Sequence, residues 1–309
     1  MSSMVKYWQL RKGSKSERVY TNLEKQIEKI FKHCRQGSIK TRERYKDGVN
    51  HFAKFLAGSY NKQNMNNIRN EHLQAYVEQM QEAGYSSSYI TTNMSAIRFF
   101  IDQEKDSSYI KGNQELGVTP RGSEERIGPS RSWTQNEVHK MQELAIEKGF
   151  ERVSDMIKLS FLQGIRIHEV TRFEKADLQR ALIAGQLTVK GKGGLVRNIP
   201  IRNQEAREHL QKLINQTDVR NSKVFVNPGE RAHEVMKQAQ NFISNNRHLV
   251  QEERGDNQAN ITFHGLRHTY TQERYVELRG QRLNDYDARL QVSKELGHFR
   301  VEITNIYLK

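Results

Sequence analysis

The C-terminal part of the chain gathers residues that could together attack a phosphodiester. The motif HGLRHTY begins at His264 and contains Arg267 and His268, and the chain ends on LGHFRVEITNIYLK, which contains His298 and Tyr307. Arginine and histidine side chains can together form a receptor for one phosphate, and a tyrosine beside that receptor can attack it. These residue types therefore predict phosphate-directed chemistry with Tyr307 as the nucleophile.

Two upstream segments could complete such a site. Arg166 lies in GIRIHEV, between a helix-ending Gly164 and Glu169. Taken alone, Arg166 could equally form a structural salt bridge with Glu169. Lys192 lies in VKGKGG, where glycines on both sides let a hairpin tip approach another backbone closely. A solvated tip charge is the simpler alternative for Lys192, and Lys190 is a second candidate because a shift by two residues keeps the same strand face.

With these motifs in place, the chain resembles the tyrosine recombinase family, the phage-integrase type of site-specific DNA recombinase. The resemblance rests on separated motifs in a fixed order: Gly164 with Arg166 and Glu169, a GKGxxxRxxP hairpin, HxLRH, LGH, and a tyrosine nine residues after the last histidine. It is motif-level from Trp133 onward and only architectural before it. The resemblance implies a catalytic set, supported by Glu169 and His268, that consists of Arg166, Lys192, His264, Arg267, His298 and Tyr307.

The chemistry expected of this set combines residue properties with the resemblance. Arg166 and Arg267 can present planar forks of donors to the non-bridging phosphate oxygens, where charge accumulates in the transition state. His264 can accept or relay the proton of Tyr307. The resemblance implies that His298 donates a hydrogen bond to the phosphate, that Lys192 protonates the departing 5′ oxygen, and that the product is a 3′-phosphotyrosine. No metal, ATP or other cofactor is expected.

Three alternative functions use the same residues. His264 and His268 are spaced like two zinc ligands, with His298 as a third, but HGLRH lacks the glutamate of HExxH and Arg267 would repel a metal ion. A type IB topoisomerase would share the tyrosine chemistry while relaxing DNA as a monomer. A DNA-binding module that has lost activity is disfavoured by the complete residue set.

The composition favours a nucleic-acid partner. The 309 residues include 50 Lys plus Arg and 36 Asp plus Glu, for a formal net charge of +14 and a pI near 9.7. The single cysteine, Cys34, excludes an internal disulfide framework and a cysteine-based zinc finger. Without a signal peptide or a membrane-length apolar run, the protein is expected in the cytoplasm, with the nucleoid when bound to DNA.

Hydrophobic spacing predicts a mainly α protein with a small antiparallel hairpin. Residues 1–16 read as a flexible basic arm, 17–105 as a helical domain, 106–131 as a linker and 132–309 as an α+β domain. The resemblance implies that 17–105 is a core-binding domain of the SAM-like type, that 132–309 is the catalytic domain, and that the two form a DNA clamp. Leu178 to Val189 is β-prone and leads into the hairpin, and Val224 to Val226 is expected to be a short buried strand.

The predicted partner is a double-stranded DNA site with inverted repeats. The resemblance implies a homotetramer on synapsed DNA, with a monomer or weak oligomer in the absence of DNA. Mobile-element integration or excision is the preferred role, ahead of Xer-like dimer resolution, and the short tail after Tyr307 leaves the link between protomers open. Candidate DNA contacts are the polar and cationic residues Lys40, Arg42, Arg44, Lys46, Ser87, Ser88, Tyr89, Thr91, Thr92, Asn93, Arg98, Lys190 and Arg197.

Overall fold

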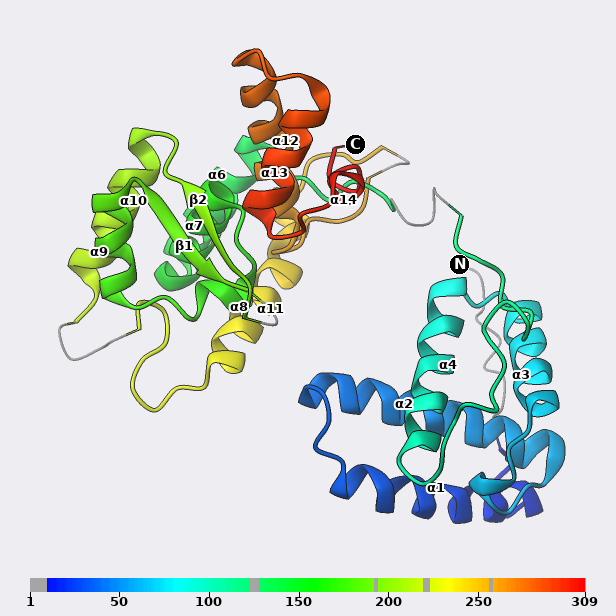
Figure 1. Ribbon diagram of the computed structural model, residues 1–309. Coiled ribbons are helices and arrows are strands. Elements are labelled where there is room, and N and C mark those ends of the chain that lie inside the picture. Colours follow the sequence, from blue (N-terminus) through cyan, green and yellow to red (C-terminus); the bar gives the residue numbers. More distant parts are fainter. Residues whose placement is uncertain (1–9, 123–127, 192–193, 219–222, 256–257, 309) are drawn as a thin grey trace. The chain divides into compact units, whose positions relative to one another are not determined.

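The chain divides into two compact units, Met1–Ser123 and Glu124–Lys309. The computed structural model describes residues 10–122, 128–191, 194–218, 223–255 and 258–308. Both units are mostly helical, and the second contains a two-stranded antiparallel sheet (Figure 1). The predicted fold class is therefore confirmed. None of the described helices is both long and apolar enough to cross a bilayer.

The described residues of the first unit form four amphipathic helices (blue to cyan in Figure 1). Serine side chains cap three of them, and Ser86 accepts the backbone N–H of Tyr89 at the start of the fourth helix. Apolar side chains from these helices form the core, Phe52 and Phe100 among them. The helices are α1 (Lys15–His33), α2 (Ile39–Phe55), α3 (Asn70–Glu82) and α4 (Ser87–Asp102), with short turns η1 (Leu56–Tyr60) and η2 (Met65–Asn67) between α2 and α3.

The segment predicted as a linker contributes to the first core. Ile110, Leu116 and Val118 are buried with the helices of this unit. Arg98 of α4 donates hydrogen bonds to Asn113 Oδ1 and to the carbonyl of residue 111, both at 2.7 Å. These apolar residues have no helical or strand period, so the sequence pattern did not reveal that residues 110–118 pack onto the first unit.

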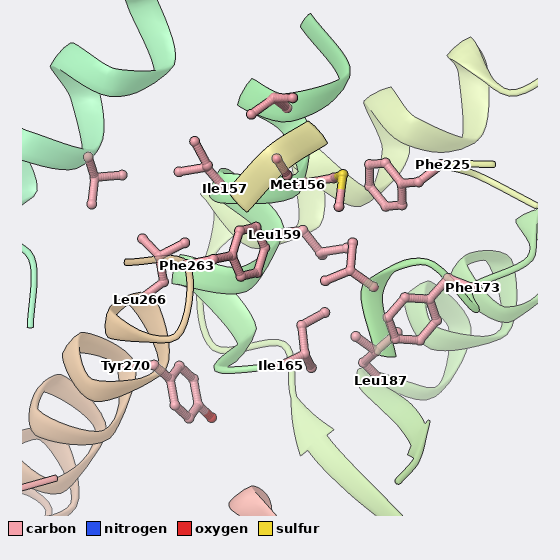
Figure 2. Packing of buried hydrophobic residues seen from close by; sticks show 14 of the residues in the cluster. Met156, Ile157, Leu159, Ile165, Phe173, Leu187, Phe225, Phe263, Leu266 and Tyr270 are labelled. Atoms are coloured by element: carbon pink, nitrogen blue, oxygen red, sulfur yellow. The ribbon is translucent and has the colours of Figure 1, made fainter. Parts of the chain in front are cut away.

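The second unit is organised around the core helix α7 (Glu151–Gln163), which packs against α6, α8, α10, α11 and α12. Met156, Ile157 and Leu159 of α7 meet apolar side chains from several other segments, among them Phe225 and Phe263 (Figure 2). The other helices in the described part of this unit are α6 (Gln135–Glu147), α8 (Ile167–Val170), α9 (Lys175–Ala184), α10 (Gln204–Gln216), α11 (Ala232–Val250), α12 (Gly265–Gly280), α13 (Asp285–Leu296) and α14 (Val301–Thr304).

The hairpin pairs β1 (Gln186–Lys190) with β2 (Val196–Pro200), and Val189 lies opposite Arg197. Two strand predictions are wrong. Most of Leu178 to Val189 is helix α9, because Leu178 and Ala181 are three residues apart among good helix formers and bury one helical face. Val224 to Val226 is not a strand; next to it a single bridge joins Lys223 to Glu174.

Candidate active site

Arg166 is positioned by the sharp end of α7. Gly164 ends that helix in the left-handed conformation, with φ of 60°, and a Cβ at this position would lie 2.3 Å from the ring of Tyr270. Only glycine fits here. Arg166 then caps α8, and its backbone N–H donates to Glu169 Oε2 at 2.8 Å while its Nη1 donates to Oε1 at 3.2 Å. The alternative predicted for Arg166, a salt bridge to Glu169, is thus present in the site.

Arg267 is fully buried near the start of α12. Its Nη1 donates to the carbonyl of Gly164 at 2.7 Å, and its Nη2 donates to the carbonyl of Leu296 at the end of α13. Burial and the nearby charge of Arg166 lower the pKa of Arg267 to about 10. The guanidinium remains charged at neutral pH and joins the segments that carry Arg166 and His298.

The start of α12 is held by the chain that enters the second unit. A Cβ at Gly265 would lie 2.0 Å from the carbonyl oxygen of Arg131, so the two backbones are in direct contact. Trp133 donates its backbone N–H to Thr269 Oγ1 at 2.7 Å and its indole N–H to the carbonyl of Thr262 at 2.9 Å. The bonds from Trp133 therefore hold the HGLRH segment on both sides, at Thr262 before it and at Thr269 after it.

The Nε2 atom of His298 is where the predicted site residues converge. It lies 3.2 Å from Arg166 Nη2, 3.4 Å from Arg267 Nη2 and 3.4 Å from the Tyr307 hydroxyl. A guanidinium can only donate, so Nε2 accepts these bonds and the ring is neutral. Burial, together with the charges of Arg267 and Arg166, lowers the pKa of His298 to about 4.

Tyr307 is buried in the site of its own chain, with 5% of its surface exposed. Gln272 of α12 donates to the Tyr307 carbonyl at 3.0 Å. The phenol ring lies 4.6 Å from the His268 ring and 6.2 Å from the His264 ring, measured between centroids. His268 is buried and His264 is exposed, so His264 is the histidine of this pair that solvent can reach.

Arg197 does not have the DNA-facing position predicted for it. It is 5% exposed, and its guanidinium donates to both oxygens of Glu169 and to the carbonyl of Glu295. A charged residue on the inner face of β2 needs such partners to be buried. Lys190 is exposed at the end of β1, and Lys192 lies outside the described residues.

One buried carboxylate near the site was missed. Glu295, 1% exposed, accepts hydrogen bonds from the Tyr270 hydroxyl at 2.8 Å and from Arg274 Nη2 at 3.0 Å. It fastens α13 to α12 just ahead of LGH. In the sequence, Glu295 is only a glutamate beside an apolar residue, Leu296. That arrangement does not show that Glu295 is buried or which residues bind it.

In the first unit, one predicted DNA contact is inaccessible. Asn93 is 0% exposed, accepts from Arg44 Nη2 at 2.8 Å and donates to the Tyr76 hydroxyl at 3.0 Å. Its role is to order Arg44, whose guanidinium also lies 4.8 Å from the centroid of the Tyr89 ring. Asn93 is a structural residue.

The other predicted contacts of this unit are at or near its surface. Lys40 and Thr91 are exposed, and Lys46 lies 3.2 Å from Glu28 in an exposed ion pair. Arg98 is partly occupied by its bonds to residues 111 and 113. Part-buried positions are taken by Arg42, Arg44, Ser87, Ser88, Tyr89 and Thr92.

The chain is similar in fold to XerH site-specific recombinase bound to a palindromic difH substrate, with 18% identity, a TM-score of 0.61, and coverage of 97% of this chain and 86% of that chain. It is also similar to a lambda integrase dimer bound to a COC′ core site, with 14% identity, a TM-score of 0.60 and 95% of both chains covered. A third similar structure is the Tn1549 transposon integrase in complex with transposon right end DNA, with 15% identity, a TM-score of 0.56 and 94% of both chains covered.

Sequence comparison with curated proteins gave no match. Two family models do match the chain. Residues 27–103 match the phage integrase N-terminal SAM-like domain, and residues 131–309 match the phage integrase family. Because the second match covers more than half of the chain, the protein belongs to the phage integrase family of tyrosine recombinases.

Proposed function

We propose that this protein is a site-specific DNA recombinase that cleaves and rejoins DNA strands through a 3′-phosphotyrosine intermediate. One observation carries the proposal: Arg166, Arg267 and the Tyr307 hydroxyl all lie within 3.4 Å of a single atom, His298 Nε2. Two guanidiniums aimed at one point form a receptor for a phosphate, and the hydroxyl beside them is within reach of its phosphorus.

The reaction balances without an external reagent. The Tyr307 oxygen attacks the scissile phosphorus, the bond from phosphorus to the 5′ oxygen breaks, and the phenol proton passes to a base, for which His264 is the exposed candidate. Arg166 and Arg267 neutralise the charge that develops on the non-bridging oxygens, and each such fixed donor is worth about 3 kcal/mol. Attack by a 5′ hydroxyl reverses the step and releases Tyr307.

The departing 5′ oxygen needs a proton, because an alkoxide is a poor leaving group. We assign that proton to Lys192 at the hairpin tip, with Lys190 as the second choice. The covalent link preserves the energy of the phosphodiester, so religation requires no ATP. Positive charge comes from arginines, and within the described residues no three His, Cys, Asp or Glu side chains gather as a metal site requires.

The substrate in this proposal is double-stranded DNA with inverted repeats around a short spacer. The formal charge of +14 and the DNA-bound state of structurally similar recombinases support a DNA partner. Exchange of two duplexes requires four protomers, each with one tyrosine. Integration or excision of a mobile element is the role we favour, and a similar structure is that of a transposon integrase.

A nicked suicide substrate tests the chemistry. DNA recovered on the Tyr307→Phe protein would be sequenced to find the site, and a nick close to the scissile phosphate would then trap the covalent product. Wild-type protein in EDTA should shift to a DNA-linked band that protease removes, and Tyr307→Phe should give none. Cleavage by Tyr307→Phe at the wild-type rate would refute the proposal, and relaxation of supercoils without synapsis would favour a topoisomerase.

A further inference from the structure

The carboxylate of Glu169 is shared by two arginines. Arg197 Nη1 donates to Oε1 at 2.9 Å and Arg197 Nη2 donates to Oε2 at 2.7 Å. Arg166 contributes its backbone N–H to Oε2 and its Nη1 to Oε1. Each oxygen therefore accepts two hydrogen bonds, which fills the lone-pair capacity of a carboxylate. The side chain of Glu169 is 0% exposed and that of Arg197 is 2% exposed.

This sharing decides what the Arg166 guanidinium can do. Arginine and a carboxylate prefer two parallel hydrogen bonds, which would use both terminal nitrogens of Arg166. Arg197 already makes that paired contact with Glu169, so Arg166 reaches the carboxylate with Nη1 alone. Its Nη2 remains directed to His298 Nε2 at 3.2 Å.

We propose that Arg197 is a positioning residue for DNA cleavage: by occupying Glu169, it keeps one half of the Arg166 guanidinium available for the scissile phosphate. The inference rests on the proposed function and deepens it. Without Arg197, Glu169 captures both terminal nitrogens of Arg166 and withdraws them from the phosphate. Arg197 does not touch the DNA itself, since it is buried.

The same side chain also fixes the distance between Glu169 and the LGH turn. Arg197 Nε donates to the carbonyl of Glu295 at 2.8 Å. A Cβ at Gly297 would lie 3.0 Å from Arg197 Cδ, and a Cβ at Gly191 would lie 3.3 Å from Arg197 Nη1. The two glycines leave room for the Arg197 side chain. Because Arg197 bonds both to Glu169 and to the end of α13, it fixes the position of Arg166 relative to His298.

The test measures single-turnover cleavage of the suicide substrate at saturating DNA, under conditions where each variant is folded. Arg197→Met should slow cleavage by about 100-fold, as removal of one transition-state donor does. DNA affinity should change by less than about threefold, because phosphate contacts elsewhere on the DNA set most of the affinity. Arg197→Lys should be intermediate, since lysine can neutralise Glu169 but cannot bind both oxygens.

The double variant Arg197→Met with Glu169→Gln separates positioning from mere stability. A neutral glutamine has no charge with which to capture Arg166, so the double variant should cleave about tenfold faster than Arg197→Met. Arg152→Met is the matched control. Arg152 at the start of α7 donates to Glu230 Oε2 at 2.6 Å, its side chain is 28% exposed, and neither residue belongs to the proposed site or to the segments that hold HGLRH. It should lose some stability yet cleave at the wild-type rate once folded.

Three results would overturn the inference: wild-type cleavage by folded Arg197→Met, a double variant no faster than Arg197→Met, or an equal loss of cleavage in Arg152→Met. If Arg197→Met does not fold, Arg197→Lys and the double variant decide in the same way. Failure of the proposed function has a different signature, because the wild-type protein would then form no more covalent product than Tyr307→Phe.

Discussion

His298 shows how single residues define this site. Its Nε2 accepts from two guanidiniums and lies within reach of the nucleophile, so it lies where an anionic oxygen would also be attracted. The surrounding cations hold the ring neutral, with a pKa lowered to about 4 by burial and by Arg267 and Arg166. A phosphate brings negative charge to the same point and favours the protonated ring.

DNA binding should therefore take up a proton at His298. The pKa is low in the free protein and higher beside a phosphate, so affinity should rise as the pH falls from about 8 to about 5.5, by at most about tenfold per pH unit for one proton. Fluorescence anisotropy with labelled site DNA across this range measures the slope. His298→Gln should have a shallower slope, and identical slopes would assign the proton to another group.

Glu169 gives a prediction about acid stability. Burial raises the pKa of its carboxyl, but the hydrogen bonds and charge of Arg197 and the backbone N–H of Arg166 outweigh it and lower the pKa from 4.5 to about 2. A depressed pKa stabilises the fold above about 4.5, and this stabilisation is lost as the pH falls toward 2. Glu169→Gln should cost about 3 to 5 kcal/mol at pH 7, because it leaves Arg197 buried without a counter-charge.

Urea unfolding of wild-type protein and Glu169→Gln at pH 7 and pH 3.5 checks this. The difference in unfolding free energy should be smaller at the lower pH. Thr188→Ala, on the exposed face of β1, is the control and should be nearly neutral at both. A difference that is the same at both pH values would show that the charge of Glu169 is not what stabilises the fold.

The residue scale also shows what the sequence revealed. The arginines, histidines and tyrosine were found because their types and order are unusual together. The burial of Arg197 could have been predicted from the alternation of β2. Exposed and buried positions alternate along this strand, and Arg197 and Ile199 are its two buried residues. The prediction that Arg197 contacts DNA relied on its positive charge and not on this alternation. Its partner Glu169 comes from another element, which no local pattern indicates.

Helix ends, more than helix middles, position this site. Gly164 ends α7, and its carbonyl accepts from Arg267. Gly297 ends α13 with φ of 74° immediately before His298. The sequence predicted the first of these ends, at Gly164, but it did not predict helix α13 or its end at Gly297. The end of helix α9 was predicted as strand because the segment Leu178 to Val189 contains the end of a helix followed directly by strand β1, so helical and strand patterns overlap in it.

A pair of glycine substitutions isolates the effect of the α7 end. Gly185 ends α9 with φ of 68°, and a Cβ at this position would have open space beyond its chain neighbours, so Gly185→Ala should cost only the strain of the backbone, about 1 to 2 kcal/mol. Gly164→Ala has the same strain plus the overlap with Tyr270. It should cost clearly more and slow DNA cleavage beyond about tenfold, because it displaces the carbonyl that binds Arg267.

Chemical denaturation gives both stabilities, and the suicide substrate gives both rates. Gly185→Ala should cleave like the wild type. Equal effects of the two substitutions on stability and cleavage would mean that the contact between Gly164 and Tyr270 has no special importance.

The whole chain is strongly basic, and much of the charge lies early. Residues 1–46 contain 13 Lys or Arg and 4 Asp or Glu, an excess of nine positive charges. Composition predicted this polyanion-binding character, and hydrophobic spacing predicted that both halves are helical. The boundary between the units was harder to predict, because Ile110, Leu116 and Val118 join the first core from an aperiodic segment.

The salt dependence of DNA affinity tests whether the positive charge of the chain contacts DNA phosphates. DNA affinity should fall linearly with salt on logarithmic axes, and each lost phosphate contact should reduce the slope by about one. Lys40→Ala should reduce it, because Lys40 is exposed beside the start of α2. Lys237→Ala on α11 also removes an exposed charge and is the control. Equal slopes for the two variants would remove Lys40 from the DNA contacts.

The contact between residues 130–133 and α12 has a practical consequence for dissecting the protein. Ser130 bridges to Gln258, Trp133 bonds to Thr262 and Thr269, and the Arg131 carbonyl lies against Gly265. A truncated version cut after Trp133 would retain every residue proposed for catalysis but lose the support beneath HGLRH. Fragments of the second unit intended for crystallisation or NMR should therefore begin upstream of Ser130.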